Sequence, residues 1–131
     1  MPLAPTREQV QQLVQSDLDG PVVMLNLLKF SRKTDDGVSG RDSYEQYGQG
    51  VRSMLEKTGA RVLWHGRVDS VVIGDEADHW DSVILVEYPS RKAFIEMTSS
   101  KSYGEVAKSR TAGLDDSRLI AMTELSRYKG G

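Results

Sequence analysis

Residues 22–30, Val-Val-Met-Leu-Asn-Leu-Leu-Lys-Phe, are the stretch that decides the fold. They are rich in apolar and β-branched side chains, and the run is short enough to be a strand. Successive side chains of a strand point to opposite faces, so this strand is apolar on both faces of its sheet. That pattern predicts a strand in the centre of a sheet that is covered on both sides.

The sequence on either side of this strand predicts two helices and a loop. Apolar residues recur at helical spacing over residues 6–18, and Thr6 with Gln9 forms a capping-box pattern at the start. Residues 31–41 are polar and predict a loop. Asp42, with a glutamate three residues later, predicts the N-cap of the second helix.

The second half of the chain predicts three more strands and a further helical region. Apolar runs over residues 60–73, 81–88 and 119–125 predict the strands, and the short acidic turn between the first two predicts a hairpin. Ser90 predicts the cap of a helix with a break near Ser99-Ser100. After the opening helix the order is β-α-β-β-α-β, which predicts an α+β, ferredoxin-like sandwich with an antiparallel sheet.

Composition narrows the class of protein. The chain has 131 residues, 38% hydrophobic and 27% charged, which predicts one domain with one core. We expect residues 1–20 to form a helical extension and residues 21–126 the core. The net charge of −2 argues against a nucleic-acid partner, and the lack of cysteine excludes a disulfide or a thiol nucleophile. No secretory signal or membrane-spanning run is present, so we expect a cytoplasmic protein with no membrane partner.

The two apolar faces of the sheet predict a homodimer. In this fold helices cover only one face of the sheet, so the other face needs a second cover. A second copy of the sheet, paired by two-fold symmetry through the open face, predicts a dimeric α/β barrel. The alternative is that the N-terminal helix folds over the open face of a monomer.

One stretch of the sequence has a family resemblance. Residues 80–94, Trp-Asp-Ser-Val-Ile-Leu-Val-Glu-Tyr-Pro-Ser-Arg-Lys-Ala-Phe, followed by Ser-Lys-Ser-Tyr at 100–103 and Arg110, resemble a bacterial domain-of-unknown-function family. That family belongs to the dimeric α/β-barrel superfamily. The resemblance implies a ferredoxin-like fold and a barrel-forming homodimer, and it implies no established reaction. The wider superfamily includes cofactor-free monooxygenases, lactone isomerases, haem-handling proteins and stress-response barrels.

Two charged residues are the first candidates for chemistry. Glu87 lies at the end of an otherwise apolar strand, where it either acts as a general acid or base or pairs with a cation at the rim of the sheet. Arg110 continues an apolar helical stripe, where it either binds a substrate carboxylate or phenolate or pairs with Glu87. A Glu87–Arg110 pair explains both residues without catalysis.

The remaining candidates are polar or aromatic. Asn26 is the polar residue inside the first strand, where its amide either binds a substrate oxygen or bridges backbone groups. His65 is a candidate acid, base or haem ligand, and Trp64, Trp80 and Tyr103 are candidate substrate contacts or core residues. Trp64 and His65 point to opposite faces of their strand.

The sequence predicts neither a metal site nor a cofactor site. The acidic turn near residues 75–81 does not have calcium-loop spacing, and no phosphate loop or complete dinucleotide motif occurs. The first functional hypothesis is a cofactor-independent enzyme, similar to a monooxygenase or isomerase, that acts on a small aromatic or carbonyl metabolite. The second is a dimer that binds a small molecule or acts in stress response without turnover. A third, haem handling, depends on His65.

Overall fold

An antiparallel sheet forms the centre of the structure, a computed structural model that describes residues 3–32 and 37–128. The strands have the order β2-β3-β1-β4, so β1 is paired on both sides as predicted. The chain order confirms the α+β, ferredoxin-like pattern with an additional N-terminal helix. The elements are α1 (Arg7–Val14), β1 (Val22–Phe30), α2 (Gly40–Thr58), β2 (Arg61–Arg67), a 3₁₀ turn (Glu76–Asp78), β3 (Ser82–Tyr88), α3 (Arg91–Thr98), α4 (Lys101–Gly113) and β4 (Leu114–Met122).

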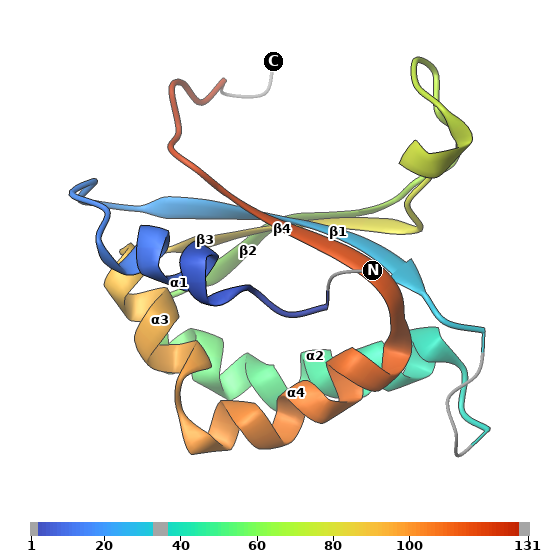
Figure 1. Cartoon of the computed structure of the whole chain (residues 1–131), viewed down its shortest axis with the longest axis horizontal. Coiled ribbons are helices and arrows are strands. Elements are labelled where there is room, and N and C mark those ends of the chain that lie inside the picture. The colour runs from blue at the N-terminus through green and yellow to red at the C-terminus, as the bar shows by residue number, and fades with distance from the viewer. Residues whose placement is uncertain (1–2, 33–36, 129–131) are drawn as a thin grey trace.

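The helices lie on one side of the sheet (Figure 1). We call this side the helix-covered face and the opposite side the open face. On the helix-covered face, side chains from β1 and β3 pack against α2 and α3. The core cluster consists of Val22, Met24, Val51, Val86, Tyr88 and Met97.

The start of α2 differs from the prediction. Asp42 is not the N-cap; the Ser39 hydroxyl accepts a hydrogen bond from the Asp42 amide, and the helix begins at Gly40. The reason is a close backbone approach that the local pattern does not show. A Cβ atom on Gly40 would lie 2.7 Å from the carbonyl oxygen of Gly113, so the helix starts where two glycines meet.

Two predicted strands have different bounds. The strand predicted over residues 60–73 ends at Arg67, because only residues up to this point pair with β3. Residues 68–81 instead form an irregular arm on the open-face side (Figure 1). The strand predicted over residues 119–125 is β4, which starts at Leu114 because its pairing with β1 reaches back to Phe30.

The open face carries apolar side chains that remain partly exposed, and α1 does not cover it. Leu13 of α1 packs against the core cluster on the helix-covered face, so the alternative that placed this helix over the open face is wrong. Trp64 and Ile120 are 56% and 45% exposed on the open face. The apolar side chains of this face are Val23, Leu25, Leu27, Trp64, Val83, Leu85, Ile120 and Met122.

Candidate functional site

The candidate residues separate onto the two faces of the sheet. Strand register places Trp64 opposite Leu85 on the open face and His65 opposite Ile84 on the helix-covered face, as predicted. Glu87 is on the open face with Leu85. Asn26, Tyr103 and Arg110 belong to the helix-covered side. The sequence candidates therefore do not form one site.

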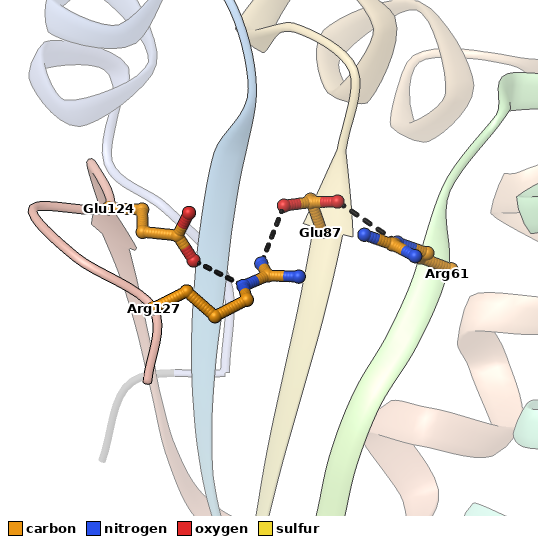
Figure 2. A network of polar contacts seen from close by, with 4 residues as sticks. All are labelled: Arg61, Glu87, Glu124 and Arg127. Atoms are coloured by element: carbon orange, nitrogen blue, oxygen red, sulfur yellow. Dashed lines mark hydrogen bonds and ion pairs between the residues drawn. The ribbon is translucent and has the colours of Figure 1, made fainter. Parts of the chain in front are cut away.

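Glu87 is bound by arginines on the open face. Figure 2 shows its carboxylate between Arg61, whose Nε lies 3.0 Å from Oε1, and Arg127, whose Nη2 lies 3.1 Å from Oε2. Arg127 also pairs with Glu124, at 2.6 Å. The predicted partner Arg110 was therefore wrong, although pairing with a cation was the correct alternative. A carboxylate that accepts from two guanidinium groups is poorly placed to accept a proton from a substrate.

Trp80 also belongs to the open-face side. Its ring lies 5.6 Å from the Lys29 ammonium and 5.1 Å from the Arg118 guanidinium, which are cation–π distances. Both cations occupy open-face positions of β1 and β4. Trp80 is thus separated by the sheet from Arg110 and Tyr103.

Arg110 is the candidate anion-binding residue on the helix-covered side. It lies in the last turn of α4 and is half-buried, and its Nη1 donates a hydrogen bond to the Leu3 carbonyl oxygen at 3.1 Å. Among the residues that the structure describes, no ion pair includes Arg110. A guanidinium without a carboxylate partner is suited to bind an anion.

Tyr44 of α2 is the phenol associated with Arg110. Burial raises the pKa of Tyr44 to about 12, and the charge of Arg110 and a hydrogen bond with it oppose that rise. The Tyr44 hydroxyl therefore stays protonated near neutral pH and can donate a hydrogen bond to a ligand oxygen. Tyr44 was not among the candidate residues identified from the sequence. The feature that could have identified it is its contact with Arg110, which lies on α4, the helix that packs against α2.

Tyr103 contacts a second phenol instead of Arg110. Its hydroxyl lies 2.9 Å from the hydroxyl of Tyr47, and the Tyr47 ring in turn lies 5.3 Å from the Tyr44 ring. Burial, together with Tyr103, raises the pKa of Tyr47, and burial also raises that of Tyr88. Tyr44, Tyr47 and Tyr103 therefore contact one another in sequence as uncharged phenols, and Tyr44 is the one next to Arg110.

Asn26 faces the helix-covered side from the middle of β1. Its Nδ2 donates to the carbonyl oxygens of Ile84 at 3.3 Å and Met24 at 3.4 Å, so the amide bridges backbone groups. The neighbouring residue on β4, Leu119, points to the same side but remains 46% exposed. The helices therefore leave the β4 end of this face accessible beside Asn26.

His65 lies in a surface cleft at the other edge of the same face. Its Nε2 is 3.0 Å from the Ser82 hydroxyl, which also lies 3.2 Å from the Gly66 carbonyl oxygen. The cleft has a volume of about 270 Å³. It is lined by Arg41, His65, Gly66, Arg67, Asp81 and Ser82.

Metal and membrane features are not found in the described part of the chain. Over residues 3–32 and 37–128, no three histidine, aspartate or glutamate residues converge in a group that could hold a metal ion. Asp75 and Glu76 lie in the arm on the open-face side, where they line a cleft of about 330 Å³. Within the same residues no helix has the length and apolar character needed to cross a membrane.

Comparison with known proteins identifies the family. The family model "Domain of unknown function (DUF1330)" matches residues 36–124, so the chain belongs to this family. The resemblance seen in the sequence is confirmed. RPA0582, a protein of unknown function from Rhodopseudomonas palustris, has a crystal structure with 36% identity and a TM-score of 0.90, covering 95% of this chain and 98% of that chain. No curated protein matches the sequence.

More distant structures share the fold. A hydroxynitrile lyase from Passiflora edulis is 10% identical with a TM-score of 0.60, covering 86% of this chain and 100% of that chain. A dimeric ferredoxin-like protein of unknown function from Thermobifida fusca is also 10% identical, with a TM-score of 0.52 and coverage of 84% and 96%. At this identity the likeness shows the ferredoxin-like fold alone.

Proposed function

We propose that this protein is a homodimeric barrel that binds a small anionic carbonyl or aromatic metabolite on its helix-covered face and acts on it without a cofactor. The observation that carries the proposal is the state of Arg110. This half-buried guanidinium has no ion-pair partner among the described residues and donates to a neutral carbonyl oxygen. Tyr44 stands beside it as a protonated phenol.

The chemistry of these groups favours an oxygen that carries negative charge. A hydrogen bond from a guanidinium to an anionic oxygen is about twice as strong as one between neutral groups. Arg110 and Tyr44 thus supply two donors to a carboxylate, phenolate or enolate oxygen. The Asn26 amide nitrogen already donates to two backbone carbonyl oxygens, so Arg110 and Tyr44 are the fixed donors that stabilise an enolate as it forms.

Proton transfer is assigned to His65 in this proposal. Glu87 is on the open face and is engaged by two arginines, so it no longer competes for that role. An imidazole both accepts and donates protons, and His65 lies on the helix-covered face with only Ile84 between it and Asn26 in the same row of the sheet. The reaction class is proton transfer at a carbon next to a carbonyl group.

The open face supports the dimer in this proposal. Monomers seldom expose several large apolar side chains on one sheet face, and a second copy related by two-fold symmetry would cover them. Leu125 and Tyr128, in the segment after β4, are 98% and 91% exposed. Figure 1 shows this segment rising on the open-face side, opposite the arm of residues 68–81.

Binding is tested with two probes, benzoate as an aromatic anion and pyruvate as a carbonyl anion. Native mass spectrometry and calorimetric titration of the full chain measure assembly and affinity. Arg110→Gln is expected to weaken binding at least tenfold, because a charged hydrogen bond contributes about 1.5–3 kcal/mol. Lys108→Gln, an exposed position on the same helix, is the matched control and leaves affinity unchanged. Equal affinity in Arg110→Gln and wild type overturns the proposed site.

Turnover is tested separately from binding. Nuclear magnetic resonance follows exchange of the pyruvate methyl protons in heavy water, which reports proton transfer next to the carbonyl. The wild type is expected to accelerate this exchange, and His65→Gln to remove the acceleration while retaining binding. Binding without any exchange in the wild type supports the second hypothesis, a dimer that binds its ligand without turnover. Its support in the structure is that His65 already contacts Ser82.

A further inference from the structure

The segment that precedes β1 crosses the helix-covered face at the proposed site. Residues 3–20, here called the N-terminal strap, comprise a short extended stretch followed by α1 and a linker. Figure 1 shows the strap on the same side of the sheet as the other helices. Its contact with the site is the hydrogen bond from Arg110 Nη1 to the Leu3 carbonyl oxygen, between residues 107 positions apart.

The strap is held by few contacts. No residue of α1 is buried, and Leu13 is the side chain of this helix that packs against the core. Val10 and Val14 remain 40% and 57% exposed. A helix with so little buried apolar surface opens at low cost compared with the rest of the fold.

The strap nevertheless has local order of its own. The Thr6 side chain accepts from the Gln9 amide and the Gln9 side chain accepts from the Thr6 amide, which completes a capping box. At the other end Gly20 has a φ of +81°, a conformation that favours glycine, directly before Pro21 and β1. The capping box thus fixes the start of α1 by contacts within the strap itself, and the Gly20 turn joins the strap to β1.

We propose that the N-terminal strap is a competitive lid, in which the Leu3 carbonyl occupies Arg110 until an anionic ligand displaces it. This inference rests on the proposed function, because the displacing ligand is the same small anion. The peptide oxygen is a neutral acceptor, so a carboxylate or enolate oxygen is the stronger partner for the guanidinium.

A lid of this kind has a measurable cost for binding. The apparent dissociation constant equals the intrinsic dissociation constant divided by the fraction of molecules in which the strap is open. Ligand and strap closure then oppose each other by the same factor. Weakening the attachment of the strap must therefore raise ligand affinity, although the substitution lies outside the binding site.

Hydrogen exchange of the full chain tests the displacement directly. Saturating benzoate, or pyruvate if benzoate does not bind, is expected to speed exchange of the amides of residues 9–15 at least threefold. The amides of β1 are the internal control and stay unchanged. Arg110→Gln is expected to show the faster exchange without ligand. Slower or unchanged exchange of residues 9–15 in the ligand complex overturns the lid while leaving the proposed function in place.

A matched pair of variants tests the competition. Leu13→Ala removes the anchor of α1, whereas Val14→Ala changes its exposed neighbour. Leu13→Ala is expected to bind the probe about threefold more tightly than wild type, and Val14→Ala to bind with wild-type affinity. Equal affinity in all three proteins contradicts the lid. Absence of binding by both probes removes the proposed function and the lid together, which distinguishes that failure from failure of the lid alone.

Discussion

The two faces of the sheet are built from alternate residues of the same strands, yet they differ in what covers them. On the helix-covered face of β1, Val22 and Leu28 are fully buried within one chain. On the open face Leu25 and Leu27 are only half-buried, although they are equally apolar. Val23, at the start of the same strand, is buried on the open face as well, so the unfilled burial is confined to the middle of β1.

The two faces also differ in whether their charged side chains have ion-pair partners. The open face neutralises Glu87 with two arginines, while the helix-covered face holds Arg110 next to phenols and a backbone carbonyl. A balanced network suits a surface that has to be buried in assembly, and an unbalanced cation suits a ligand site. The proposed function assigns assembly to the open face and ligand binding to the helix-covered face.

The largest expected effect is the weakening of the dimer by a substitution of Ile120 in β4, with its neighbour Leu119 as the control. Ile120 and Leu119 are 45% and 46% exposed, and they point to the open and helix-covered faces respectively. Ile120→Asp places two carboxylates in the proposed two-fold interface, and it is expected to weaken the dimer about 1,000-fold, or by about 4 kcal/mol. Leu119→Asp is the control of equal exposure. Sedimentation measures both, and a dimer that tolerates Ile120→Asp contradicts assembly through the open face.

The next largest expected effect is on the free energy of unfolding, and it is tested by comparing Leu28 with Leu27. Leu28→Ala leaves a cavity at a fully buried position and is expected to lower the free energy of unfolding by about 3 kcal/mol. Leu27→Ala affects a half-buried open-face position, so its cost is expected to depend on protein concentration through the dimer. Urea unfolding at two concentrations separates the cases. Concentration-independent loss in Leu27→Ala would show that the open face is stable without a partner.

Alkaline pH is expected to act through the helix-covered face. Burial raises the pKa of Tyr44 from 10.0 to about 12, so the unfolded chain loses this proton first as the pH rises. The stability that depends on the neutral phenol is complete below pH 10 and is lost as pH approaches 12. Between these pH values the free energy of unfolding falls by about 1.4 kcal/mol per pH unit for each such tyrosine. Tyr44→Phe is expected to reduce the slope, as measured by urea unfolding across this range.

Phenolate absorbance supplies the control for the pH prediction. Spectrophotometric titration of the folded protein should show buried tyrosines ionising at higher pH than the same residues in urea. The tyrosines with raised pKa all lie on the helix-covered side. Identical titration curves for the folded and unfolded protein would mean that burial does not protect these phenols.

The strands and their faces were predictable because their signals are local. The bounds of β1 were correct, and alternation placed Trp64 and His65 on opposite faces. The length of β2 was wrong because the apolar residues after Arg67 belong to an exposed arm. Val72 is 90% exposed there, which a residue's own hydrophobicity does not reveal. Strand ends depend on pairing partners that are distant in sequence.

The candidate site was less predictable because its contacts join distant segments. Sequence spacing suggested that Arg110 points inward, but it did not show that its partner is the backbone of Leu3. It also grouped Glu87 with Arg110, since both are charges in apolar patterns. The sheet separates the two residues: strand register assigns Glu87 to the open face, and α4 carries Arg110 on the helix-covered side. Tyr44 was missed because tyrosine in a helical stripe is most often a core residue.

The smallest predicted effect concerns the Glu87 network in Figure 2. Glu87→Gln keeps the shape of the side chain but removes the charge that both arginines contact. The side chain is 17% exposed, so the expected loss is about 1 kcal/mol in unfolding free energy. Asp69→Asn, which breaks an ion pair whose side chains are 76% and 77% exposed, is the control and should change little.

The outcome for Glu87 separates a structural group from a catalytic one. A network that serves the open face predicts lower stability in Glu87→Gln with unchanged benzoate or pyruvate affinity and unchanged proton exchange. Loss of proton exchange at full stability would instead return Glu87 to the role of an acid or base. That result would also require the ligand to reach the open face, which the proposed dimer buries. The smallest substitution thus tests whether the two faces of the sheet function separately.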